Sequence, residues 1–285
     1  MENKVSSPKI LNIVVCVIPL IIFVIYNAVN VNAEEINPKE ELINKIELGN
    51  KYPSLINKNN INIEKEINKL ENFINEKKET ILFFTNMFGY DYEEVINNII
   101  NKEKEYGYFI ENNIGYITNK DGTLIKYKNF EYGLIEYLYK IKDIKRTKKY
   151  VPYMGSSEYI EKLIIYFSNI YDNVDPVVLL GIGAAESGYY KVKYMLKSNN
   201  IYGGMSRSGL IKHENIELGV LSYTRMMSKN YYGKGLNNIY SIGKVYCPVI
   251  ENNTKIASPH WINLVNKAIE KYKDIEKNIT INDLI

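Results

Sequence analysis

The stretch Asp175-Pro-Val-Val-Leu-Leu-Gly-Ile-Gly-Ala-Ala-Glu-Ser-Gly188 decides the fold of the C-terminal half of the chain. Asp175 is a residue type that caps the N-terminus of helices, and proline suits the first helical position. An apolar run follows, with Glu186 as its one ionisable residue, and Gly188 is a typical helix stop. The pattern predicts a helix with a carboxyl group in its last turn.

Glu186 shares a helical face with aliphatic side chains. At 3.6 residues per turn, Leu179, Ile182 and Glu186 fall on one stripe. A carboxyl group on such a stripe loses hydration, and its pKa rises. It can then stay protonated near neutral pH and give its proton to a leaving oxygen. The alternative is a core helix whose last turn carries a solvated glutamate.

The composition of the chain limits which partners and cofactors we expect. The chain has 285 residues, enough for two modest domains or one large one, and its net charge of +3 is too small to imply a nucleic-acid partner. Cys16 lies in an apolar N-terminal run, which leaves Cys247 without an internal disulfide partner. The two histidines, His213 and His260, lack the spacing of metal ligands. We therefore expect no metal and no other cofactor.

The N-terminus has the pattern of an export signal. Lys4 and Lys9 precede an apolar run from residue 10 to 31, and Val31-Asn32-Ala33 is a small-residue cleavage motif. The run also approaches the roughly 20 residues that span a bilayer. Residues 1–33 are thus a cleaved signal peptide or an uncleaved membrane anchor through residues 10–31, and either way the rest of the chain is exported.

The exported part divides into three regions. Residues 34–60 are polar and predict a stalk. The accessory region, 61–150, is predicted to be mainly helical and is a candidate binding module for a protein partner. Its expected elements are an amphipathic helix over 61–78, two helices from Thr80 to Lys104 separated by Gly89, a small β-hairpin around Asp121-Gly122 and a helix over 130–141.

A mainly helical domain is expected over residues 151–285. A Lys/Arg-rich stretch, with Pro152 and Gly155 after it, predicts the boundary near residue 150. Ser157 is a candidate cap for the first helix of this domain. Further helices are predicted over 216–227 and from Ser258-Pro259 onward, with loops at 187–215 and 229–257. The fold class is therefore mainly α.

Four short motifs follow one another in this domain. They are Glu186-Ser187-Gly188, the segment Asn199-Asn200-Ile201-Tyr202-Gly203-Gly204-Met205, Tyr246-Cys247-Pro248, and Trp261 with Val265. In this order and spacing they resemble the glucosaminidase family of peptidoglycan hydrolases, whose domain has a lysozyme-like fold. The resemblance covers roughly residues 155–275.

The resemblance implies roles for particular residues. Glu186 matches the family's proton donor to the glycosidic oxygen, and Tyr246 matches an aromatic residue across the cleft from it. The implied substrate-binding residues are Ser187, Asn199, Asn200, Tyr202, Gly203 and Trp261. Aromatic faces and amides are indeed the groups that bind sugars. Each also has a structural alternative: the asparagines can cap a loop, Gly203 can permit a tight turn, and the aromatic residues can be core.

The second catalytic group is left open. Inversion needs a base about 6.5–9.5 Å from the acid, and retention usually needs a nucleophile about 5 Å away. Glu214 is the better candidate, and Glu217 is expected on the solvated first turn of the next helix. The acetamido group of the substrate, or a water held by Tyr246, are the alternatives.

These observations lead to one leading interpretation and two alternatives. The leading one is an exported endo-β-N-acetylglucosaminidase on the outer face of the bacterial membrane or in the cell wall, or secreted if cleaved after Ala33. It would cut peptidoglycan glycan strands at the β-1,4 bond after N-acetylglucosamine. The first alternative is a lytic transglycosylase on the same fold, although its usual Gly-Leu-Met-Gln segment is missing. The second is an inactive wall-binding or scaffold protein.

Overall fold

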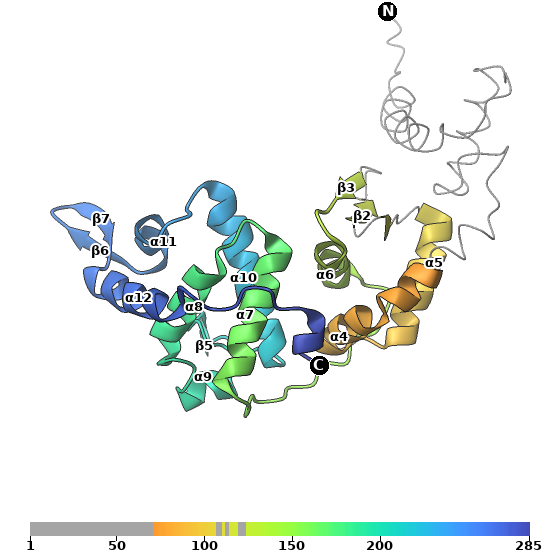
Figure 1. The fold of residues 1–285 in the computed structure, drawn as a ribbon, viewed down its shortest axis with the longest axis horizontal. Coiled ribbons are helices and arrows are strands. Elements are labelled where there is room, and N and C mark those ends of the chain that lie inside the picture. Colours follow the sequence, from red (N-terminus) through yellow and green to blue (C-terminus); the bar gives the residue numbers. More distant parts are fainter. Residues whose placement is uncertain (1–70, 107–109, 112–113, 119–123) are drawn as a thin grey trace, which may run out of the picture. The chain divides into compact units, whose positions relative to one another are not determined.

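The computed structural model describes residues 71–106, 110–111, 114–118 and 124–285. These residues are mainly helical with a few short strands, as the sequence predicts. They form two units (Figure 1): one comprises the described residues up to Phe84 together with Asp91–Ile144, and the other comprises Thr85–Tyr90 and Lys145–Ile285. The predicted signal or anchor, the stalk and most of the amphipathic helix over 61–78 lie outside the described residues.

The first unit combines helices with a small sheet. It contains most of α4 (Lys78–Phe88), α5 (Tyr92–Tyr106) and α6 (Phe130–Lys140), and α6 packs against β2. The strands β1 (Ile110–Glu111), β2 (Ile114–Thr118) and β3 (Leu124–Lys126) form an antiparallel sheet in that order. The predicted hairpin between residues 114 and 128 is confirmed, and its turn at Asp121-Gly122 lies outside the described residues. The predicted break at Gly89 is also confirmed, since α4 ends at Phe88.

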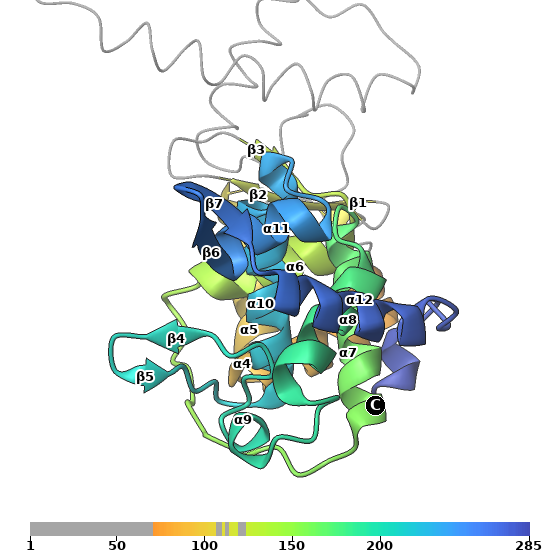
Figure 2. The ribbon, with the colours of Figure 1, turned by 90° about the vertical axis from the view of Figure 1, so that its left-hand side faces the viewer.

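The second unit is built around α8 (Pro176–Ser187), which packs against α7 (Ser157–Tyr171) and α12 (Pro259–Tyr272). Helix α10 (Ile216–Asn230) packs on the same α7 (Figures 1 and 2). Helix α11 (Ile239–Tyr246) contacts α12 and the hairpin of β6 (Pro248–Glu251) and β7 (Thr254–Ala257).

The loops predicted at 187–215 and 229–257 contain short elements. The first holds α9 (Lys193–Lys197) and a hairpin of β4 (Met205–Ser206) with β5 (Gly209–Leu210), which Figure 2 shows extending beside α9. The second holds η1 (Tyr232–Lys234), α11, β6 and β7. A last 3-10 turn, η2 (Ile281–Asp283), follows α12. Elements of two to five residues carry too little periodicity to be recognised in a sequence.

The ends of α8 are those that its sequence predicts. Asp175 accepts a hydrogen bond from the Val177 N–H at 2.9 Å, and Gly188 ends the helix in the left-handed region with φ 57°. The helix is apolar on all sides, which is typical of a helix surrounded by others. Its residues Leu179, Leu180 and Ile182 are fully buried.

One glycine of α8 allows α12 to approach closely. A Cβ atom placed on Gly181 would lie 2.5 Å from Ile269 Cγ1 and 3.3 Å from the Val265 carbonyl oxygen. A glycine inside a helix costs about 1 kcal/mol relative to alanine, and the close packing of the two helices offsets that cost. The position of α8, and with it that of Glu186, is therefore fixed by α12.

Ser156, not Ser157, caps α7. Its hydroxyl accepts a hydrogen bond from the Tyr159 N–H, and its backbone is extended, whereas Ser157 is the first helical residue. Both serines fit the sequence preference for a cap, so only the backbone distinguishes them. Ser258 caps α12 as predicted, with Pro259 at the first helical position.

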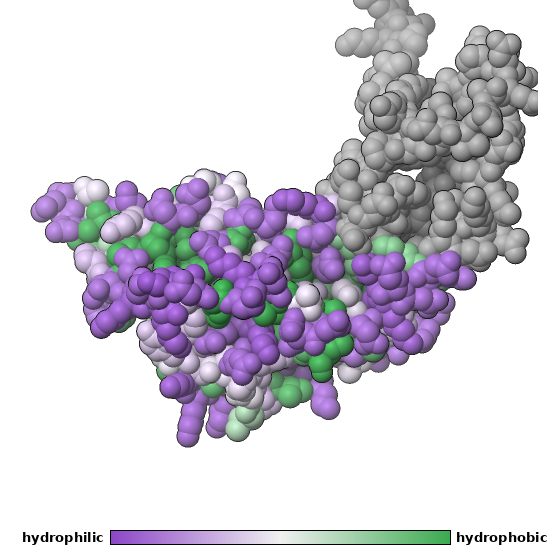
Figure 3. Space-filling view, viewed as in Figure 1, coloured by the Kyte–Doolittle hydropathy of each residue, from purple (hydrophilic) through white to green (hydrophobic). Residues whose placement is uncertain are grey.

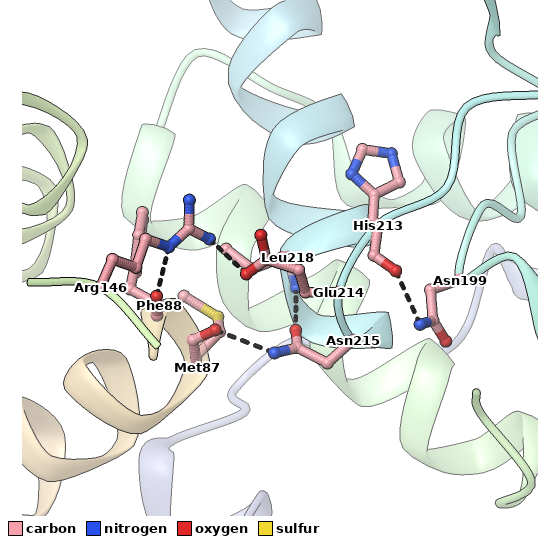
Figure 4. Close-up of polar contacts among 8 residues, drawn as sticks. All are labelled: Met87, Phe88, Arg146, Asn199, His213, Glu214, Asn215 and Leu218. Atoms are coloured by element: carbon pink, nitrogen blue, oxygen red, sulfur yellow. Dashed lines mark hydrogen bonds and ion pairs between the residues drawn. The ribbon is translucent and has the colours of Figure 1, made fainter. Parts of the chain in front are cut away.

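Within the second unit, residues that follow Ile144 contact the end of α4. Arg146 forms an ion pair with Glu214 at 2.7 Å and donates from Nε to the Phe88 carbonyl (Figure 4). Asn215, the cap of α10, donates from its amide to the Met87 carbonyl at 2.8 Å. The sequence predicts a boundary near residue 150, and the two units divide at Ile144–Lys145.

The face of the described residues that Figure 3 shows is mainly polar. Figure 3 shows hydrophilic side chains over most of the visible face and a group of apolar side chains around α11. The exposed apolar residues of α11 and β6 are Val245, Val249 and Ile250.

Candidate active site

Glu186 lies in the last turn of α8, half-buried. Its Oε1 atom accepts a hydrogen bond from the indole Nε1–H of Trp261 at 2.8 Å. The two residues are far apart in sequence, and the packing of α8 against α12 brings them together. The predicted proton donor and the predicted tryptophan therefore contact each other directly.

Trp261 is held from several sides. It lies in the first turn of α12, where its N–H bonds the capping hydroxyl of Ser258. Its ring packs on α11, since a Cβ atom on Gly243 would lie 3.0 Å from the ring atom Cζ3. The Trp261 side chain is buried, and its one polar atom bonds Glu186. The indole is thus a fixed support for the carboxyl group and not an open platform for a sugar.

Two opposing influences set the pKa of Glu186. Burial raises the pKa, and the hydrogen bond from Trp261 lowers it by favouring the carboxylate. The larger of the two is burial, so the pKa lies above its usual range. The direction is the one expected from the sequence and suits a general acid.

Tyr246 is the third side chain of the candidate site, after Glu186 and Trp261. Its ring centroid is 5.4 Å from that of Trp261, and its hydroxyl donates to the Tyr202 carbonyl at 2.6 Å. Burial first, and then the nearby Glu186, raise the pKa of Tyr246 far above its usual value. The phenol stays neutral at physiological pH, so it can orient a water or a substrate group and does not serve as a base.

Tyr202 and Gly203 lie beside the carboxyl group in different ways. The Tyr202 ring is buried and stacks on Tyr223, with 3.4 Å between the ring centroids. Tyr202 therefore contributes to the candidate site through its backbone carbonyl, which accepts the hydrogen bond from Tyr246. Gly203 has φ 70°, and a Cβ atom on it would lie 3.7 Å from Glu186 Oε2. Of these two predicted binding residues, Gly203 is the one next to Glu186 Oε2.

Asn199 and Asn200 hold the chain together. Both are buried, at 0% and 4% exposure. The Asn199 amide donates to the carbonyls of Val151 and His213 and accepts from the Tyr153 N–H. Asn200 donates to the carbonyls of Gly204 and Ile211 and accepts from the Gly204 N–H, which fixes the base of the β4–β5 hairpin. These amides are occupied by backbone partners, as in the structural alternative.

The Ser187 hydroxyl also has hydrogen-bond partners within the protein. Its buried hydroxyl donates to the Gly183 carbonyl at 2.5 Å and accepts from the Tyr190 N–H at 3.0 Å. It closes the turn after α8 and presents no group to a ligand. The prediction that Ser187 binds substrate is thus replaced by a role in shaping the end of the helix.

Neither candidate for a second acid contacts Glu186. Glu214 is bound to Arg146 (Figure 4), and Glu217 accepts a hydrogen bond from the Tyr159 hydroxyl at 2.8 Å. Burial raises the pKa of Glu186 and the hydrogen bond from Trp261 lowers it, and neither influence comes from a second carboxylate. The structure therefore assigns Glu214 to the scaffold, because its carboxylate neutralises an arginine at the start of the unit.

The structure adds a feature that sequence reasoning missed. Tyr189 and Tyr190 follow Gly188 with φ 56° and 61°, so three successive residues are left-handed. Such backbone costs of order 1–3 kcal/mol per non-glycine residue and gathers at functional sites. Tyr190 holds the turn by donating to the Leu180 carbonyl at 2.9 Å, and the Lys271 ammonium lies 4.8 Å from the Tyr189 ring centroid. Only Gly188 signalled a turn here.

Within the described ranges, no group of three or more histidine, cysteine, aspartate or glutamate side chains is placed to hold a metal ion. Among those same residues, none of the helices has the length and hydropathy needed to cross a bilayer. Comparison of the chain with protein-family models, curated proteins and solved structures finds no match.

Proposed function

We propose that the protein is a glycoside-cleaving enzyme in which Glu186 is the general acid. The observation that carries this proposal is the half-buried carboxyl group of Glu186, whose pKa is raised and whose Oε1 is held by Trp261. Glycosidic bonds need a protonated acid at the leaving oxygen. Gly203 lies beside the carboxyl group and Tyr246 packs on Trp261, so these neighbours of the acid carry no charge.

We further propose a lysozyme-like fold for the second unit and peptidoglycan glycan strands as the substrate. A buried central helix with the acid in its last turn, followed by a short β-hairpin, supports this fold. The four motifs that resemble the glucosaminidase family include the contacting residues Glu186, Tyr202, Tyr246 and Trp261. The bond proposed to be cut is the β-1,4 bond after N-acetylglucosamine.

The chemistry needs no second carboxylate. Glu186 donates its proton to the glycosidic oxygen as the C1–O bond breaks, and the shorter strand leaves with a free hydroxyl. The acetamido oxygen of the same sugar bonds to C1 and stabilises its positive charge. A water then attacks C1, the acetamido bond breaks, and the Glu186 carboxylate takes up the water proton. The sugar is released with a reducing end and a retained configuration.

A water held by Tyr246 is the alternative to the acetamido group. In that case the water attacks C1 directly as the C1–O bond breaks, its proton passes to the surrounding solvent because Tyr246 is not a base, and the configuration is inverted. NMR spectroscopy of the first product formed distinguishes the two, because the β anomer marks retention and the α anomer marks inversion. The partners of Glu214 and Glu217, which are Arg146 and Tyr159, support a route that uses neither carboxylate.

A lytic transglycosylase is the second candidate function, and the same observation favours it. An enzyme of that kind uses a single acid, and a hydroxyl of the muramyl sugar closes an internal anhydro ring in place of water. Mass spectrometry of digested sacculi separates the candidates. A reducing N-acetylglucosamine end supports the hydrolase, and an anhydro-muramyl end supports the transglycosylase.

The test of catalysis compares three proteins on a gel that contains cell walls. We expect the wild type and the Glu251→Gln control to clear the gel, and Glu186→Gln to leave it turbid. Glu251 is exposed on β6 and is not part of the candidate site. The Glu251→Gln variant therefore controls for the loss of one negative charge. Circular dichroism must show that Glu186→Gln is folded. Clearing by all three would refute Glu186 as the general acid, and clearing by none would leave a wall-binding or scaffold protein as the better description.

The cellular setting is a proposal of its own. We infer attachment to the membrane through residues 10–31, or release after Ala33, with the second unit outside the cell at the wall. The accessory region 61–150 is the proposed site of a protein partner. Fractionation of cells that produce the tagged chain, followed by mass determination of its N-terminus, decides between anchor and cleaved signal.

A further inference from the structure

The two oxygens of Glu186 have different surroundings. Oε1 accepts the hydrogen bond of the Trp261 indole at 2.8 Å. Oε2 lies near Gly203, where a Cβ atom would be 3.7 Å away. The two atoms of one carboxyl group are therefore distinguishable before any substrate binds.

The chemistry of the indole decides which oxygen can carry the proton. An indole Nε1–H is a donor only, and in a protonated carboxyl group the oxygen without the proton is the better acceptor. A proton on Oε1 would leave the indole at 2.8 Å with the weaker acceptor of the two oxygens. The acid form of Glu186 therefore favours a proton on Oε2.

Trp261 cannot move aside to relax this preference. Its backbone is fixed by the Ser258 cap at the start of α12, and its ring packs against Gly243 of α11. The ring centroid of Tyr246 lies 5.4 Å away at an angle of 35°. A buried side chain with contacts on three sides keeps one orientation, so the selection of Oε2 is built into the fold.

Gly203 leaves space in front of that oxygen. A methyl group there would be in van der Waals contact with Oε2, whereas a substrate oxygen must come within about 2.5–3.0 Å of it to receive the proton. The φ of 70° also disfavours any other residue at this position. Gly203 is thus suited to expose the protonated oxygen, beyond its use in turning the chain.

We propose that Trp261 is a positioning residue that fixes the catalytic proton on Oε2 of Glu186, and that Gly203 keeps open the approach of the glycosidic oxygen to it. The inference rests on the proposed function for its consequence in catalysis. The fixed protonation site itself does not depend on which glycan is cut.

The first test uses the fact that Trp261 is the single tryptophan of the chain. Its fluorescence therefore reports on the atom that it binds. We expect the emission of the wild type and of Glu251→Gln to titrate with a midpoint above the usual pKa of glutamate, and that of Glu186→Gln to be flat in the same range. A titration that survives in Glu186→Gln would overturn the proposed contact.

The second test uses the pH profile of Trp261→Phe. Removing the indole N–H removes the influence that lowers the pKa of Glu186, so the basic limb of kcat/KM should move to higher pH. Because the carboxyl group also loses the contact that holds its position, we expect a loss of about 10- to 100-fold in kcat. A loss of activity with an unchanged basic limb would assign Trp261 a merely structural role and would refute the proposal.

The third test compares neighbouring glycines. Gly203→Ala should lower kcat/KM at least 10-fold while the fluorescence titration stays as in the wild type, and Gly204→Ala should retain activity. A Cβ atom on Gly204 has only ordinary contacts at 3.7 Å or more, which makes it the matched control. Equal activity of Gly203→Ala and wild type would refute the role of Gly203. If Glu186→Gln stays active while the wild-type titration is seen, the proposed function fails and the contact stands.

Discussion

Glu186 combines two requirements that oppose each other. Desolvation keeps the acid protonated, and a hydrogen bond to one oxygen holds it in place but favours the carboxylate. Because the indole donates to Oε1 only, the orientation is gained at the cost of part of the pKa shift. An apolar neighbour such as leucine would raise the pKa more and would leave the carboxyl group free to rotate.

This residue should make the stability of the protein depend on pH in a defined direction. Its pKa is higher in the folded state than in the unfolded chain, so its contribution to stability is fully present below the unfolded pKa and is lost as the pH rises through the folded pKa. Glu186→Gln has no charge to bury. We therefore expect its Tm, relative to the wild type, to increase between pH 4 and pH 8.

Thermal unfolding of both proteins at the two pH values measures this difference, with Glu251→Gln as the exposed control. The partial exposure of Glu186 reduces the size of the effect but not its sign. A Tm difference between Glu186→Gln and wild type that is the same at pH 4 and pH 8 would show that the carboxyl group is not destabilised by burial.

At the scale of elements, α8 positions the acid through its packing on α12. Gly181 permits this packing, since a Cβ atom there would lie 2.5 Å from Ile269 Cγ1. Gly181→Ala gains about 1 kcal/mol of helix propensity and introduces an overpacked contact that costs about 1–3 kcal/mol. We expect a net loss of stability of up to about 2 kcal/mol in urea unfolding.

The same substitution should also displace the carboxyl group from the indole, because α8 and α12 carry one partner each. Tryptophan fluorescence of the folded variant should titrate less than that of the wild type. The matched variant is Gly181→Ala with Ile269→Ala, in which the nearest clashing atom is gone. If the double variant is no better than the sum of the single ones, the clash with Ile269 is not the cause.

The two ends of α8, the start of α12 and the existence of the hairpin of β2 and β3 follow from local signals. Asp175, Gly188 and Ser258 act on residues within four positions of themselves, so a sequence contains all that is needed to predict them. The sequence also identifies Glu186 correctly as the ionisable residue of an apolar helix. Its predicted rise in pKa has the direction found in the structure.

The partners of the site could not be predicted in the same way. The contact between Glu186 and Trp261 joins two helices, and whether a tryptophan supports an acid or faces a sugar depends on that packing. Asn199 and Asn200 have the composition of sugar-binding amides, and only the folded backbone shows that their donors are used by carbonyls. The left-handed Tyr189 and Tyr190 contradict local preference, which sequence reasoning follows.

At the scale of the molecule, the second unit includes a segment that precedes it by more than fifty residues. Thr85–Tyr90 belongs to it, and the Thr147 N–H bonds the Gly89 carbonyl at 2.7 Å. A Cβ atom on Gly89 would lie 2.1 Å from the Thr147 carbonyl oxygen, so this approach requires glycine. The unit that carries the proposed active site is therefore completed by chain from the end of α4.

Arg146 is the residue on which this completion depends most. Its guanidinium bonds both Glu214 and the Phe88 carbonyl, with the two charged side chains about one quarter exposed (28% and 24%). Arg146→Met keeps much of the apolar stem and leaves a partly buried carboxylate without its cation, which should cost about 1–2 kcal/mol in urea unfolding. Lys145→Met removes the same charge from an exposed neighbour and should change stability by less than about 0.5 kcal/mol.

The loss of Arg146 should also loosen the start of α10. Asn215 lies next to Glu214, caps α10 and bonds the Met87 carbonyl. We therefore expect Arg146→Met to increase hydrogen exchange at the start of α10 and to leave the fluorescence titration of Glu186 unchanged. Equal unfolding free energies for the two variants would mean that the segment 85–90 is held by its backbone hydrogen bonds alone.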